Sequence, residues 1–97
     1  MAPGLFIDGR AAASLPLPDR GLAYGDGLFE TLLVRGRKPA FLALHADRLE
    51  SGLARLGMPA PPWREHLAAS LAAFEAPRER WLTLRLTVTR GEGPRGY

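Results

Sequence analysis

Two stretches with strictly alternating side chains constrain the fold of this 97-residue chain more than any other feature. Residues 24–35, YGDGLFETLLVR, enter from glycines into a segment that alternates between two faces. One face carries Phe29, Thr31 and Leu33, and the other carries Leu28, Glu30, Leu32 and Val34. Residues 81–89, WLTLRLTVT, alternate leucine or valine with mainly polar residues. A period of two predicts β-strands, the second with one apolar and one polar face.

Between these stretches the apolar spacing changes to that of helices. From Leu44, a leucine stripe continues through Leu49, Leu53 and Leu56 and ends at Gly57, a common helix stop. Three prolines, at 59, 61 and 62, separate it from a second helix that begins near Trp63 and runs to about residue 74. The pattern predicts two amphipathic helices in succession.

Two hairpins complete the expected fold. Asp8-Gly9 favours a tight turn between residues 5–7 and a return segment at residues 10–13. Residues 35–39 form a second expected turn, with 40–42 as its return strand. The prediction is an α+β domain of two layers, with a mainly antiparallel sheet and two helices on one face.

Composition excludes several classes of protein and site. The length supports one small domain, and the absence of cysteine excludes disulfides and thiolate zinc sites. No second histidine lies at metal-ligand spacing from His45, so no metal site is expected. Twelve arginines and one lysine give a net charge of +3, but they are scattered among ten acids, which argues against nucleic-acid binding. Without a signal-peptide pattern or a membrane-spanning run, a cytoplasmic protein is expected.

Arg48 is the first candidate for a functional residue. It lies beside the leucine stripe of the first helix, three residues after His45. It could extend to water or pair with a nearby acid, Asp47 or Glu50. Alternatively, its planar fork of donors could clamp a phosphate.

The last residues, RGEGPRGY, form the second candidate. Arg95 and Tyr97 follow a strand end, where an arginine and a phenol suit a carboxylate, although a solvated terminus is the simpler interpretation. Lys38 is not expected to be catalytic, because it lies on a hairpin turn, whereas a Schiff-base lysine needs a desolvated pocket.

Four stretches together resemble a known family. LFIDGR, DRGLAYGDGLFETLLV, LHADRLESGLARLG and TRGEGPRGY occur in the order and spacing of the N-terminal domain of fold-type IV pyridoxal-phosphate enzymes, the class IV aminotransferases. Within that class, DRGLAYGDGLFET and RGxGxRGY are most similar to the aminodeoxychorismate lyases. The resemblance covers essentially residues 1–97.

The resemblance implies roles for four residues. Arg48 matches the arginine of the HxxRL motif that binds the cofactor 5′-phosphate. Arg95 matches an arginine that binds the substrate carboxylate in related aminotransferases. Tyr97 stands where some members have a histidine, and Phe29 where some have a substrate-facing tyrosine, so both are expected at the substrate.

The resemblance also implies what the intact protein does. It predicts conversion of 4-amino-4-deoxychorismate to 4-aminobenzoate and pyruvate in folate biosynthesis, by a homodimer that uses pyridoxal 5′-phosphate. The Schiff-base lysine belongs to a second domain that residues 1–97 do not contain, so this chain is expected to be an inactive fragment without a catalytic residue of its own. The alternatives are a class IV aminotransferase of the D-amino-acid or branched-chain type or, if the chain is complete, a non-catalytic basic binding module.

Overall fold

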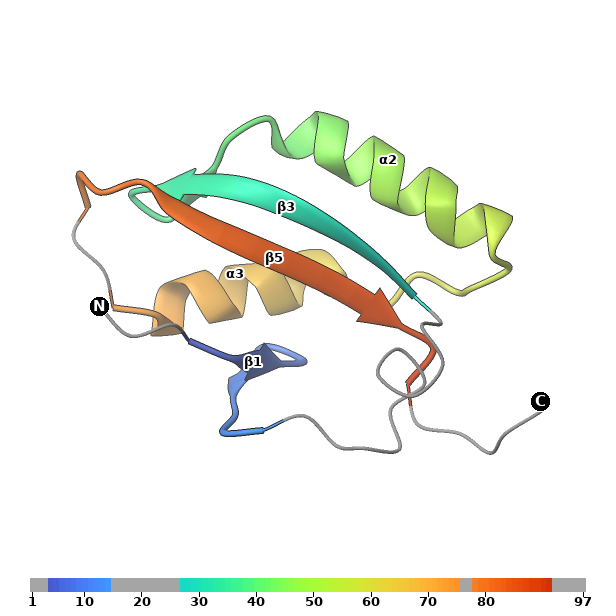
Figure 1. Cartoon of the computed structure of the whole chain (residues 1–97), viewed down its shortest axis with the longest axis horizontal. Coiled ribbons are helices and arrows are strands. Elements are labelled where there is room, and N and C mark those ends of the chain that lie inside the picture. Colours follow the sequence, from blue (N-terminus) through green and yellow to red (C-terminus); the bar gives the residue numbers. More distant parts are fainter. Residues whose placement is uncertain (1–3, 15–26, 76–77, 92–97) are drawn as a thin grey trace.

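The computed structural model describes residues 4–14, 27–75 and 78–91 (Figure 1). Two short strands come first and are followed by a longer strand, a short strand, two helices and a last long strand. In chain order the elements are β1 (Phe6–Ile7), β2 (Arg10–Ala11), β3 (Gly27–Arg35), β4 (Lys38–Pro39), α2 (Leu42–Arg55), α3 (Trp63–Ala73) and β5 (Leu82–Thr89).

The two alternating stretches pair with each other as antiparallel strands. Figure 1 shows β3 and β5 side by side, and the strand order of this sheet is β4-β3-β5. The register runs from Gly27 opposite Thr89 to Val34 opposite Leu82, so the apolar positions of both strands fall on the same face. Side chains on that face are buried or partly buried, whereas Phe29, Thr31 and Leu33 on the other face are exposed. The strand predictions are therefore confirmed.

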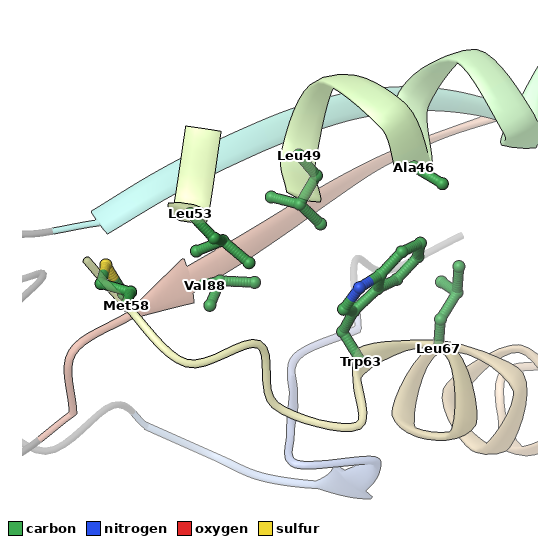
Figure 2. Close-up of a cluster of buried hydrophobic side chains, with 7 residues drawn as sticks. All are labelled: Ala46, Leu49, Leu53, Met58, Trp63, Leu67 and Val88. Carbon is green, nitrogen blue, oxygen red and sulfur yellow. The ribbon is translucent and has the colours of Figure 1, made fainter. Parts of the chain in front are cut away.

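Both helices contribute to one core against this face. The shared cluster, drawn in Figure 2, consists of Ala46, Leu49, Leu53, Met58, Trp63, Leu67 and Val88. Leu28, Leu84 and Leu86 of the sheet pack against it. Burial of this apolar surface stabilises the two layers together. The predicted α+β domain with two helices on one face of an antiparallel sheet is confirmed.

Gly57 ends α2 as the sequence predicts. Its φ of 67° lies in the left-handed region, which glycine adopts without steric cost. The Gly57 N–H donates to the Ala54 carbonyl (3.1 Å), and the Met58 N–H donates to the Leu53 carbonyl (2.9 Å). This pair of hydrogen bonds is a Schellman motif. It turns the chain so that Met58 enters the core beside Leu53 (Figure 2).

The first hairpin is confirmed, with Asp8 and Gly9 both at positive φ between β1 and β2. The second is shorter than predicted, and the expected return strand at residues 40–42 is wrong. Gly36 and Arg37 form a two-residue turn at positive φ, which pairs Arg35 with Lys38 and Val34 with Pro39. Phe41 then adopts a left-handed conformation (φ 54°), and α2 begins at Leu42. No described helix is long and apolar enough to cross a membrane.

Candidate functional site

Glu30 is a buried acid on an apolar strand face. It lies on the inner face of β3 between Leu28 and Leu32, and its side chain is 7% exposed. It is the one charged residue that is buried among those the structure describes. A buried carboxylate is stable in its ionised form only with charged or hydrogen-bonding partners.

Helix α2 supplies both partners of Glu30. His45 and Arg48 are three residues apart and therefore share the side of the helix that faces this part of β3. Arg48 donates from Nε to Oε2 (2.9 Å) and from Nη2 to Oε1 (2.8 Å). His45 Nδ1 lies 2.7 Å from Oε1. The three side chains form one cluster, the Glu30 cluster, which joins the sheet to the helix.

The hydrogen bonds between Glu30 and Arg48 favour the charged form of both side chains. Hydrogen bonds from Arg48 lower the pKa of Glu30, burial raises it, and His45 lowers it further, so the net shift is downward from 4.5. The hydrogen bonds to Glu30 raise the pKa of Arg48 in turn. Glu30 is therefore a carboxylate and Arg48 a guanidinium at neutral pH.

Arg48 keeps donors for a second anion. Its Nε and Nη2 bind Glu30, while Nη1 makes no hydrogen bond to the described residues, and the side chain is 72% exposed. Pairing with Asp47 or Glu50 is not observed, because the partner comes from the strand and not from the same helix. A guanidinium fixed on one edge and open on the other can bind a phosphate or carboxylate.

Phe29 lies on the opposite face of the same strand. Its ring is 55% exposed on the outer face of the sheet, and the Arg85 guanidinium stands 4.1 Å from the ring centroid. Adjacent residues of a strand point to opposite faces, so the side chains of Phe29 and Glu30 diverge. The structure therefore does not bring Phe29 to the Arg48 guanidinium, which contacts Glu30 on the inner face of β3.

Three other residues were considered from the sequence, namely Arg95, Tyr97 and Lys38. Arg95 and Tyr97 lie outside the described residues. Lys38 is exposed on β4, as expected of a lysine without a desolvated pocket. Within the described ranges no three potential ligands are grouped to hold a metal ion.

Sequence reasoning missed the role of Glu30, although a signal was present. An acid in the alternating series of Leu28, Leu32 and Val34 must be buried with them, and a buried acid requires a partner. The partner could not be read from the sequence, because His45 and Arg48 are 15 and 18 residues away.

Comparisons with known proteins agree with this fold. The family model for amino-transferase class IV matches residues 27–97. An aminodeoxychorismate lyase of Vibrio harveyi is 30% identical over 92 residues, which are 95% of this chain and 33% of that protein.

Two solved structures are also similar. The 4-amino-4-deoxychorismate lyase of Pseudomonas aeruginosa is 51% identical with a TM-score of 0.77, over 93% of this chain and 32% of that one. A hypothetical aminotransferase of Mycobacterium tuberculosis, in its PLP-bound form, is 28% identical with a TM-score of 0.68, over 96% of this chain and 35% of that one. The chain thus spans about a third of the length of these relatives. By the extent of these matches, the chain belongs to the class IV aminotransferase family.

Proposed function

We propose that this chain is the N-terminal part of an aminodeoxychorismate lyase that uses pyridoxal 5′-phosphate. The observation that carries the proposal is the Glu30 cluster, which holds a guanidinium in place and leaves its outer edge open. The likeness to two aminodeoxychorismate lyases, one of them 51% identical, supports this reaction among those of the family.

Arg48 binds the 5′-phosphate of the cofactor in this proposal. Arg48 fits that group, because a guanidinium with free N–H donors is matched in charge and geometry to a phosphate. When bound, pyridoxal phosphate supplies an electron sink that stabilises negative charge developing on the substrate. Arg48 contributes orientation, since an anchored phosphate fixes where the cofactor ring lies.

Glu30 and His45 prepare Arg48 for this role. Glu30 fixes the rotamer of the Arg48 side chain by accepting hydrogen bonds from Nε and Nη2, so less side-chain entropy is lost when phosphate binds. His45 occupies the same carboxylate oxygen as Arg48 Nη2 and closes the cluster on its other side. The aligned donors are thus in place before the anion arrives.

The remaining roles follow from the family resemblance. Phe29, with the outer face of the sheet around it, contacts the substrate, and Arg95 and Tyr97 bind its carboxylate. The Schiff-base lysine comes from a second domain of a longer polypeptide. The 97-residue chain by itself lacks that lysine and is therefore inactive. The intact enzyme is a cytoplasmic homodimer in which the Arg95 loop reaches the partner's site.

Pyruvate release tests the reaction. The full polypeptide that contains this chain, loaded with pyridoxal phosphate, is incubated with 4-amino-4-deoxychorismate. Equimolar pyruvate and 4-aminobenzoate are expected. Transfer of the amino group to a 2-oxo acid without release of pyruvate would instead identify an aminotransferase, the second candidate, which the likeness to the hypothetical aminotransferase of M. tuberculosis favours.

Arg48→Met tests the phosphate site separately from the reaction. The substitution keeps the hydrocarbon stem and removes the donors, so cofactor affinity is expected to fall while turnover at saturating cofactor is partly retained. Lys38→Met is the control, since Lys38 is exposed on β4 and has no proposed role. Unchanged cofactor affinity in Arg48→Met would rule out the phosphate assignment.

A further inference from the structure

His45 has one ring nitrogen that the Glu30 cluster does not use. Its Nδ1 lies 2.7 Å from Glu30 Oε1, whereas Nε2 makes no hydrogen bond to the described residues. The His45 side chain is 20% exposed, so protons reach the ring from solvent. A histidine that is held at one nitrogen and accessible to protons can change its charge without changing its position.

The Glu30 carboxylate decides which nitrogen of neutral His45 carries the hydrogen. Glu30 is ionised, because the hydrogen bonds from Arg48 hold it in the charged form. An ionised carboxylate only accepts hydrogen bonds, and a neutral imidazole has one N–H and one bare nitrogen. The hydrogen is therefore on Nδ1, and Nε2 is the atom that binds a second proton.

The charges of the Glu30 cluster do not balance a phosphate while His45 is neutral. The Glu30 carboxylate and the Arg48 guanidinium cancel each other, which leaves the cluster without net charge. A phosphate monoester carries about 1.5 to 2 negative charges at pH 7. Protonation of His45 gives the cluster a net positive charge, which an anion requires.

The groups around His45 keep the ring close to the proposed phosphate site. From β3 it contacts Glu30, and from its own helix Arg48 shares Glu30 Oε1 with it. Among the described residues, these two are the charged groups that take part in the cluster with the ring. Leu86, which lies opposite Glu30 on β5, is apolar. The ring and the guanidinium are thus close neighbours on one carboxylate.

We propose that His45 takes up a proton at Nε2 when the cofactor phosphate binds to Arg48. The proton comes from solvent, one N–H bond forms, and the imidazolium becomes a second cationic partner of the phosphate. A bound anion favours the protonated form of a neighbouring imidazole, and the imidazolium strengthens the binding of the anion in return. The inference rests on the proposed role of Arg48 and adds that occupation of its site depends on pH.

Calorimetric titration of the full polypeptide with 4′-deoxypyridoxine 5′-phosphate tests the inference. This analogue lacks the aldehyde of the cofactor, so it reports on the phosphate site without a reaction at a lysine. Titrations at about pH 7, in buffers with different enthalpies of ionisation, measure the protons taken up per ligand bound. His45→Asn keeps an amide N–H for Glu30 and removes the titratable ring. Ionisation of the ligand itself is the same in both proteins and cancels in the comparison.

The unsubstituted protein is expected to take up more protons per bound ligand than His45→Asn. Its affinity should also fall, relative to that of the variant, by at least about threefold between about pH 6 and pH 8, where histidine titrates. His66→Asn is the matched control, since this second histidine lies on α3 near Asp8 (3.9 Å) and outside the Glu30 cluster. Equal proton uptake in the unsubstituted protein and His45→Asn would overturn the inference.

Two further variants separate this inference from the proposed function. His45→Gln also keeps an amide and cannot titrate, and it replaces His45→Asn if that protein does not fold. Arg48→Met tests the phosphate site itself. If the analogue binds Arg48→Met as tightly as the unsubstituted protein, the phosphate assignment fails and the inference fails with it. If binding depends on Arg48 but takes up no proton at His45, the inference alone fails.

Discussion

Arg48 and Glu30 form two parallel hydrogen bonds, Nε to Oε2 and Nη2 to Oε1, although 18 residues separate them in the chain. The pair joins α2 to the inner face of β3. His45 Nδ1 contacts Oε1 of the same carboxylate. The geometry makes Glu30 a positioning residue for the proposed phosphate site, because it acts on the cofactor through Arg48.

Glu30→Gln is expected to weaken cofactor binding by at least about tenfold, because the neutral amide holds the guanidinium less firmly. Absorbance titration of the full polypeptide with pyridoxal phosphate measures the change. Asp47→Asn is the matched control, since Asp47 is an exposed acid next to Arg48 on the same helix. Similar losses in both variants would show that net charge, and not the pair, governs cofactor binding.

The lowered pKa of Glu30 predicts how the free energy of unfolding depends on pH. Its folded pKa lies below 4.5, so its contribution is fully present above about pH 4.5 and is lost as the pH falls through the folded pKa. The difference in free energy of unfolding between the unsubstituted protein and Glu30→Gln should therefore be constant near neutral pH and shrink below pH 4.5. Urea unfolding across this range measures it, and a difference that grows on acidification would contradict the assignment.

Leu49→Ala is expected to destabilise the protein by about 2–5 kcal/mol, because it leaves a cavity in the shared core. Leu44→Ala makes the same change in the same helix at a side chain that is 68% exposed, and it should alter the free energy of unfolding by less than about 0.5 kcal/mol. Equal effects in denaturant unfolding would contradict the assignment of Leu49 to the shared core.

Gly57→Ala is expected to cost about 1 kcal/mol, because a Cβ disfavours the left-handed φ of 67° that ends α2. Apart from its two chain neighbours, no residue in the described part of the chain comes within 4 Å of a Cβ at this position, so the cost comes from the backbone conformation and not from a clash. Gly57→Asn should cost less, since asparagine tolerates this region better. Thermal unfolding of the two variants provides the comparison, and the reverse order would disprove the capping argument.

Phe29→Ala is expected to raise KM for the substrate several-fold and to leave cofactor affinity unchanged, because Phe29 and Arg48 lie on opposite faces of the sheet. Leu33→Ala is the control on the same face, where Leu33 is 53% exposed and Phe29 is 55% exposed. Steady-state kinetics together with cofactor titration separate the two effects. Equal KM values in the two variants would contradict the proposed contact between Phe29 and the substrate.

Local patterns in the sequence determined most of the elements of this fold. The period of two in β3 and β5, the leucine stripe of α2 and the stop at Gly57 each depend on near neighbours in the chain. Such signals are strong because one face of each element must be buried. The predicted return strand at residues 40–42 is wrong because the backbone conformations of Gly36, Arg37 and Phe41 decide where β4 ends. Apolar content alone does not reveal these conformations.

The sequence also determined the candidate status of Arg48, through its position beside the leucine stripe and through the family motif. Only the tertiary structure decided its partner. Asp47 and Glu50 are nearer in the chain, but packing of α2 on β3 brings Glu30 to the guanidinium and buries the carboxylate there. Contacts of this kind depend on how helix and sheet pack, which no local pattern encodes, and here they hold the guanidinium of an exposed arginine in a fixed orientation.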